Sequence, residues 1–131
     1  MGFDQYHEPP EELPPATRTF ARLCASLTEE AEAIGWYEQR IAVEADPQAL
    51  SVMRDAQGEE FKHFSMDLEF LLRRSPTWRR IAQGVLFQEG DIVEHGEAAE
   101  AEASDDDRGT GVFAGDGSGS LGIGSLKGAT R

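Results

Sequence analysis

The sequence has few of the features that stabilise secreted proteins or anchor membrane proteins. Its single cysteine, Cys24, excludes an intrachain disulfide, and its place on an apolar stripe indicates a core residue. No apolar run approaches the roughly 18 residues that a membrane-spanning helix needs. The opening residues, MGFDQYHEPPEE, lack the basic start and the apolar stretch of a secretory signal. We therefore expect a cytoplasmic protein with no membrane partner.

Positive charge is scarce as well. Lys and Arg number 12 against 25 Asp and Glu, which gives a net charge of −13 and a pI near 4.5. Phosphate backbones attract Lys and Arg, so this balance argues against a nucleic-acid partner. An acidic surface attracts metal cations, although many acidic proteins use their charge only for solubility.

Apolar residues are spread unevenly along the chain. Most large ones, with both Trp and both Tyr, lie before residue 88, and an acidic stretch without Lys or Arg follows, then a Gly- and Ser-rich one. The later stretches bury too little apolar area to offset their ordering entropy. We predict a flexible N-terminus (1–13), a helical domain (14–88), an acidic and Gly-rich flexible linker (89–117) and a C-terminal peptide (118–131).

Hydrophobic periodicity predicts two long helices and a short one. After Pro14-Pro15 the apolar residues recur every three or four positions: Phe20, Leu23, Cys24, Leu27, Ala31, Ile34, Tyr37 and Ile41. A second stripe follows Asp46-Pro47, a predicted N-cap and first position, and ends near Arg74. A short helix from Thr77 to about Phe87 follows Ser75-Pro76. No segment shows the strand period, so we predict an all-α fold.

Two long helices joined by a tight turn form an antiparallel hairpin. One hairpin leaves half of each apolar stripe in water. Pairing two hairpins into a four-helix bundle covers both stripes. The pattern therefore predicts a dimer before any chemistry is considered.

Three polar residues interrupt these stripes. Glu30 lies on the face of Leu27 and Ile34, and Glu60 and His63 lie three apart on the second stripe. In a hairpin that turns near residue 46, they stand at similar distances from the turn. We therefore expect these three side chains to meet.

This residue set suits a metal. Glu on one helix with Glu-x-x-His on the next is half of a di-iron carboxylate site, and a two-fold dimer would supply the other half. Carboxylates can bridge metals and imidazole suits iron, while Ca²⁺ or Zn²⁺ would fit the same ligands. A buried polar network that only sets the register of the bundle is the alternative. Spacing alone supports the two equally.

Other side chains near this set have two interpretations each. Glu29 and Glu32 would form a cation entrance or a solvated face. Asp67, one turn beyond the histidine, would accept a hydrogen bond from its imidazole or lie exposed. Trp36 and Tyr37 suit packing, although the Tyr37 hydroxyl would reach a ligating carboxylate.

The C-terminal stretch SGSLGIGSLKG contains spaced apolar residues in a Gly/Ser background. Leu121 and Ile123 are two apart, as in an extended peptide that fills adjacent pockets, and Leu126 follows. A bare linker needs none of them. The stretch is typical of a docking peptide.

Two parts of the chain carry a family resemblance. GSLGIGSLKG resembles the C-terminal targeting peptides of encapsulin cargo proteins. The body from about His7, with TEEAEAIGWYEQR, ADP and GEEFKHFSMDLEFLLRR, resembles the encapsulated ferritins. The resemblance implies a ferritin-like four-helix bundle made by two hairpins, and dimers assembled into a ring, usually a decamer, inside an encapsulin shell that stores the product.

The resemblance also implies the chemistry. It implies a ferroxidase that oxidises Fe²⁺ with O₂ at a di-iron centre, with Glu30, Glu60 and His63 of two chains as ligands. By the same resemblance, Glu29 and Glu32 match the acidic positions where metal enters, and Tyr37 and Trp36 match aromatic residues near the centre. Two other functions stay open: a non-catalytic helical cargo or scaffold protein, and a divalent-cation buffer without redox turnover.

Overall fold

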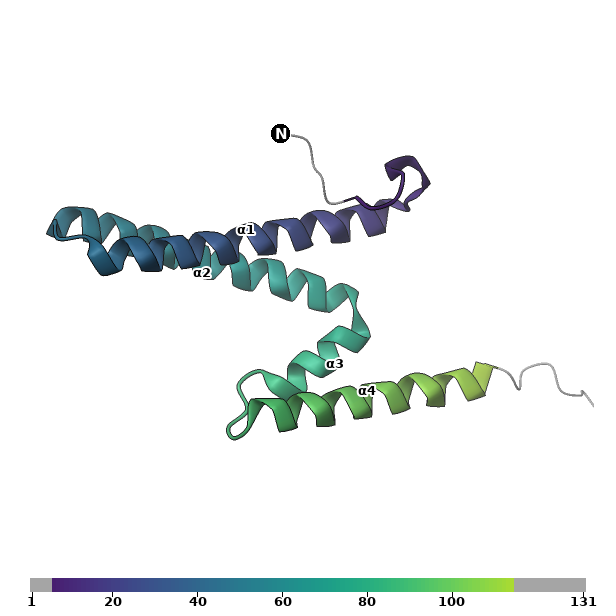
Figure 1. Cartoon of the computed structure of the whole chain (residues 1–131). Coiled ribbons are helices and arrows are strands. Elements are labelled where there is room, and N and C mark those ends of the chain that lie inside the picture. Colours follow the sequence, from purple (N-terminus) through teal and green to yellow (C-terminus); the bar gives the residue numbers. More distant parts are fainter. Residues whose placement is uncertain (1–5, 115–131) are drawn as a thin grey trace, which may run out of the picture. The chain divides into compact units, whose positions relative to one another are not determined.

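The computed structural model describes residues 6–114, with side chains through residue 108, and this part of the chain is helical apart from turns and short connections (Figure 1). Its elements are η1 (Pro10–Glu12), α1 (Pro15–Val43), α2 (Pro47–Arg74), α3 (Pro76–Val85) and α4 (Ile92–Ala114). The all-α prediction is confirmed for these residues, and η1 lies inside the segment that we expected to be flexible.

Helices α1 and α2 form the predicted antiparallel hairpin and lie side by side in Figure 1. The chain leaves α1 at Glu44, whose carboxylate accepts hydrogen bonds from the backbone N–H groups of Ala45 and Asp46, both at 2.9 Å. Asp46 then caps α2, because its Oδ1 accepts from the Ala49 N–H at 2.8 Å. Backbone N–H groups in the turn and at the start of α2 are therefore hydrogen-bonded by side chains of the turn itself.

The start of α3 also follows the prediction. Its N-cap is Ser75, whose Oγ accepts a hydrogen bond from the Trp78 N–H at 3.4 Å, and Pro76 occupies the first helical position. The helix ends at Val85, slightly before the predicted Phe87. Two residues later Phe87 adopts the left-handed backbone (φ 61°), so the chain does not continue as a right-handed helix.

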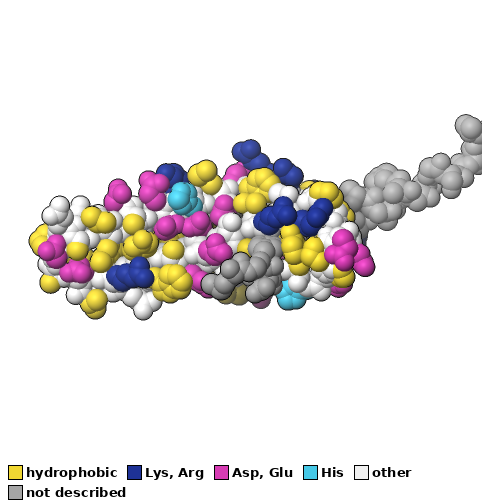
Figure 2. All heavy atoms as spheres, turned by 90° about the horizontal axis from the view of Figure 1, so that it is seen from above, with side chains coloured by type: hydrophobic (Ala, Val, Ile, Leu, Met, Phe, Trp, Pro, Cys, Tyr) yellow, Lys and Arg dark blue, Asp and Glu magenta, His cyan; other side chains and the backbone are white. Residues whose placement is uncertain are grey.

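The hairpin buries little of its apolar surface. Leu71 and Leu72 are its buried hydrophobic residues, whereas Trp36, Phe61 and Met66 are all more than half exposed. Figure 2 shows hydrophobic side chains open to solvent among acidic ones. Large apolar side chains in water favour a partner surface.

A second compact unit begins at Arg80 and contains α4. Here the structure differs from our prediction of a flexible linker over 89–117, because α4 occupies residues 92–114. Asp91 caps this helix, accepting from the Glu94 N–H at 2.9 Å, and the segment is rich in alanine, the best helix former.

Packing of α4 on the end of α3 relies on small side chains. Ala99 and Ala103 are buried, and a Cβ built on Gly84 would lie 2.6 Å from the Ala99 Cβ. An ion pair of 2.9 Å joins Arg80 to Asp106 across the same contact. The sequence pattern does not reveal this helix, because the prediction rested on large apolar residues and the contact is made by Gly and Ala.

In the part of the chain that the structure describes, no helix combines the length and the apolar character needed to cross a membrane. The predicted docking residues Leu121, Ile123 and Leu126 lie outside the described residues.

Candidate metal centre

One cluster in the described part of the chain has the ligand types and spacing of a metal site. Glu30 comes from the middle of α1, and Glu60 and His63 come from one turn of α2. One ligating atom of each residue lies within 4.8 Å of the other two. The helical period of each stripe and the tight turn between them bring the three residues together, as the sequence predicts.

His63 lies close to the carboxylates of both helices. Its Nδ1 lies 3.4 Å from Oε2 of Glu60 and 4.0 Å from Oε2 of Glu30. The Glu30 and Glu60 side chains are 23 % and 22 % exposed, and His63 is 45 % exposed. The cluster therefore opens at the surface of the hairpin, where a cation or a second chain can reach it.

The two carboxyl groups shift each other's pKa in opposite directions. The pKa of Glu30 is raised, first by its hydrogen bond with Glu60 and then by burial and by the charge of Glu60. The pKa of Glu60 is lowered, first because it accepts that hydrogen bond and further through His63. Two carboxylates this close cannot both ionise freely. A divalent cation between them would favour the ionised form of both groups.

Asp67 lies near the cluster without a partner for one of its oxygens. Its charge contributes to the raised pKa of Glu30, and its Oδ2 is buried with no hydrogen-bond partner. This oxygen does not accept from the imidazole of His63. The predicted hydrogen bond is thus not made by Oδ2, and a supporting role for Asp67 stays a prediction.

The other predicted residues lie outside the cluster. Glu29 and Glu32 are exposed on α1, as either of their two interpretations requires. Tyr37 is half-buried, with the guanidinium of Arg40 5.4 Å from its ring centre, and Trp36 is 53 % exposed. The geometry does not test the roles predicted for these four residues, which stay predictions.

Comparison with known proteins places this geometry in a family. The family model described as EncFtn-like matches residues 5–89, which include α1, α2, α3 and all three cluster residues. The chain belongs to the EncFtn-like family. An "Encapsulated ferritin-like protein" of Rhodospirillum rubrum is 40 % identical over 124 residues, which cover 93 % of this chain and 87 % of the relative. A "Ferritin-like protein" of Thermotoga maritima is 40 % identical over 91 residues, which cover 70 % of this chain and 80 % of the relative.

A solved structure agrees with the fold of this EncFtn-like chain. Protein ne0167 from Nitrosomonas europaea superposes with a TM-score of 0.66 at 34 % identity, covering 68 % of this chain and 98 % of that one. The ferritin-like fold is therefore shown, and the resemblance noted from the sequence is confirmed at the level of the family.

One residue of the EncFtn-like hairpin was missed by sequence reasoning. Gln57 is 8 % exposed and donates hydrogen bonds to α1, although it is not one of the apolar positions from which the helix face was predicted. It stands three residues before Glu60, so the two share a helix face. This spacing from a candidate ligand is the signal that could have revealed it.

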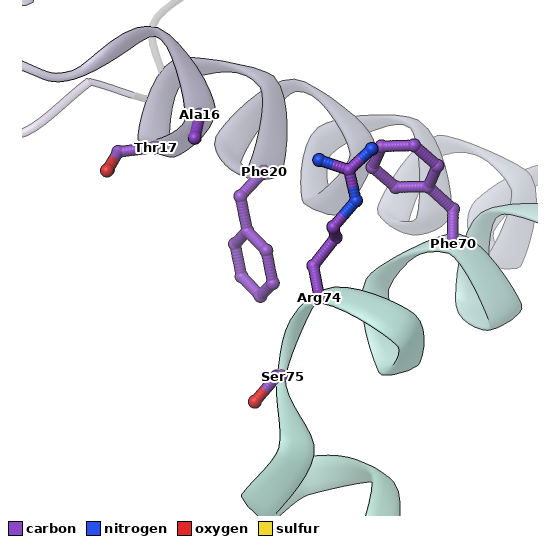
Figure 3. A pocket seen from close by; sticks show the side chains of 6 residues that line it. All are labelled: Ala16, Thr17, Phe20, Phe70, Arg74 and Ser75. Atoms are coloured by element: carbon purple, nitrogen blue, oxygen red, sulfur yellow. The ribbon is translucent and has the colours of Figure 1, made fainter.

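A pocket of about 400 Å³ lies elsewhere on the hairpin, between the start of α1 and the end of α2 (Figure 3). Phe20 and Phe70 contribute rings to it, and the Arg74 guanidinium lies 4.6 Å from the Phe70 ring centre. Its lining contains no carboxylate or imidazole. It is therefore chemically unlike the cluster around Glu30.

Proposed function

We propose that this chain is a ferroxidase that oxidises Fe²⁺ with O₂ at a di-iron site completed by dimerisation. The observation that carries the proposal is the open Glu30, Glu60 and His63 cluster on an EncFtn-like hairpin. The names of the two relatives, both "ferritin-like", support iron as the metal.

The donor set fits a pair of iron ions. One chain supplies two carboxylates and one imidazole, so a two-fold dimer supplies twice that number. Four carboxylates balance the charge of two Fe²⁺ ions, and carboxylate with imidazole is a ligand set that iron accepts. The exposed Trp36, Phe61 and Met66 support the dimer, because a second hairpin would cover apolar surface. Assembly into a decameric ring rests on the family resemblance alone.

The residues of the chain act before any electron moves. Exposed Glu29 and Glu32 attract Fe²⁺ to the mouth of the cluster. Glu30, whose pKa is raised, loses its proton as the cation binds, and Glu30, Glu60 and His63 would serve as the ligands. Bound as a pair, the Fe²⁺ ions supply electrons to O₂ and become Fe³⁺.

Three further residues support the cluster in this proposal. Asp67 adds negative charge beside Glu30 and offers the unpartnered Oδ2 to an incoming cation or to a reoriented His63. Trp36 and Tyr37 both lie about two turns along α1 from Glu30 and shape the surface that a second chain would cover.

The oxidised iron is stored inside an encapsulin shell in this proposal. The name of the Rhodospirillum rubrum relative, "Encapsulated ferritin-like protein", supports the partnership. We assign the docking to Leu121, Ile123 and Leu126 of the C-terminal peptide, on their spacing and on the resemblance to cargo peptides.

Oxygen-dependent oxidation of Fe²⁺ by the purified full chain tests the reaction. We expect Glu60→Gln and His63→Ala to slow it by about a hundredfold, since even partners outside the ligand shell are worth about 10- to 100-fold. Asp55→Asn, an exposed acid on another face of α2, is the matched control and should leave the rate unchanged.

Each alternative predicts a different outcome of this experiment. A scaffold protein would form a metal-free dimer by native mass and would oxidise no Fe²⁺ above the buffer rate. A cation buffer would bind Ca²⁺ or Zn²⁺, and Fe²⁺ as well, without consuming O₂. Equal rates in wild-type protein and both ligand variants would remove the site assignment.

A further inference from the structure

Gln57 is a polar side chain in the hairpin core. It is the only polar residue classed as buried in the part of the chain that the structure describes, where the other buried residues are Leu and Ala. An amide that is buried without partners is costly. Its hydrogen bonds therefore indicate why it is there.

Both hydrogen bonds of Gln57 cross from α2 to α1. Its Nε2 donates to the backbone carbonyl of Ile34 at 3.3 Å and to Oε2 of Glu38 at 2.9 Å. The Ile34 carbonyl lies in the backbone ladder of α1, so its height along the helix axis is set. Apolar contacts tolerate small slides of one helix on another, because hydrophobic side chains can repack. The amide does not, since a slide leaves its donors unpaired.

This cross-link stands one turn from the candidate ligands on both helices. Gln57 precedes Glu60 by three residues, and Ile34 follows Glu30 by four. The three ligating atoms lie within 4.8 Å, so a slide by a fraction of the roughly 5.4 Å helical pitch would separate them. Before a cation binds, Glu30 and Glu60 repel each other whenever both are ionised. The half-site needs a restraint that does not depend on the metal.

We propose that Gln57 is a positioning residue that sets the register of α1 against α2 and so holds Glu30 within reach of Glu60 and His63. The inference rests on the proposed metal site. Glu38 shares the task, because its carboxylate accepts the shorter of the two hydrogen bonds. The half-site is thereby preorganised in each hairpin before dimerisation and metal binding.

Co²⁺ binding to the full chain tests this role without requiring turnover, because its visible absorption reports both affinity and coordination geometry. We expect Gln57→Leu, which keeps the volume and removes the donors, to weaken Co²⁺ binding by about 10-fold or more and to change the spectrum. Glu38→Ala leaves the Ile34 bond in place and should weaken binding by roughly threefold. In the double variant the Glu38 change should add nothing, because both act through one contact.

Gln39→Leu is the matched control. Gln39 is an exposed glutamine on α1 whose Nε2 donates to the carbonyl of Gly35 in its own helix at 3.3 Å. Its loss should change neither the Co²⁺ affinity nor the spectrum. Urea unfolding of each variant separates stability from site geometry.

The outcomes distinguish this proposal from the function on which it rests. A lower free energy of unfolding in Gln57→Leu, with Co²⁺ affinity and spectrum unchanged, would show a purely structural role and overturn the proposal. If Gln57→Leu does not fold, the exposed Glu38→Ala decides by the same readout. Co²⁺ binding without Fe²⁺ oxidation would defeat the ferroxidase and leave the register role standing on its own result. A wild-type chain that binds no Co²⁺ would overturn both.

Discussion

At the scale of the residue, protonation of Glu30 competes with binding of the cation. The pKa of Glu30 is raised by its hydrogen bond with Glu60, and that of Glu60 is lowered by accepting it. Glu60 is therefore already ionised over the pH range in which Glu30 titrates. One proton should leave for each half-site that fills.

Metal affinity should consequently rise with pH through the raised pKa of Glu30 and then level off. In that range Co²⁺ affinity should increase by about tenfold for each pH unit, as for release of one proton. The stability of the metal-free chain changes with pH in the opposite direction. Because the pKa of Glu30 is raised in the folded state, its contribution to stability is complete below the unfolded-state pKa and is lost as pH rises through the folded-state pKa. Calorimetric titrations at several pH values measure the first effect, and urea unfolding without metal measures the second.

Asp67→Asn is the sharpest control for this pH dependence. The charge of Asp67 contributes to the raised pKa of Glu30, so its removal should move the rise in affinity to lower pH. The metal-free chain should become more stable, because a negative charge with a buried, unpartnered oxygen is removed. At high pH, where Glu30 is ionised in both proteins, Asp67→Asn should bind Co²⁺ more weakly. An unchanged pH profile would separate Asp67 from the site.

At the scale of the element, the contact of α3 with α4 depends on the absence of one Cβ. A side chain at Gly84 would begin 2.6 Å from the Ala99 Cβ, far inside van der Waals contact. The buried Ala99 and Ala103 have no flexible end that could move away. Here helix propensity and packing oppose each other at one position.

The two effects differ enough in size to predict the outcome. Gly84→Ala gains about 1 kcal/mol of helix propensity, but overpacking costs typically 1–3 kcal/mol. We expect net destabilisation of the α3–α4 contact in thermal unfolding. Gly96→Ala, in α4 with nothing within 4 Å of its added Cβ, is the matched control and should stabilise by up to about 1 kcal/mol. Equal gains at the two positions would show that the close approach is absent in solution.

At the scale of the whole molecule, oxidation and storage are separable. The proposed metal site lies in the hairpin, and the proposed docking residues lie in the peptide at 118–131. Deleting 118–131 should abolish co-purification with a co-expressed encapsulin shell protein and leave the rate of Fe²⁺ oxidation unchanged. Replacing Leu121, Ile123 and Leu126 by Ser in the full chain should have the same effect if apolar anchors make the contact. Shell loading by the truncated chain would end the docking proposal.

Much of the hairpin could be predicted because its causes are local. The helical period identifies the faces of α1 and α2, and the short sequence between them forces the two helices to lie antiparallel. The Asp46 and Ser75 caps follow from residue type and from the prolines after them. Glu30, Glu60 and His63 meet for the same reasons, since equal distances from a turn become equal heights in a hairpin.

Two features could not be predicted in this way. Residues 92–114 look acidic and poor in large apolar side chains, and only the close approach of Gly84 to Ala99 shows what α4 packs on. In the sequence, its residue type does not distinguish Gln57 from the other polar residues of α2, and only its hydrogen-bond partners on α1 identify its role. Both depend on pairs of residues distant in sequence, which periodicity does not relate.

The sequence by itself thus determined the helical hairpin and its three-residue cluster, because period, caps and turn length act within a few residues of each other. The tertiary structure decided the raised pKa of Glu30, the buried amide between the helices and the Gly–Ala contact of α4. These arise from distances of a few ångströms between different helices, and hydrogen bonding and packing change steeply over such distances.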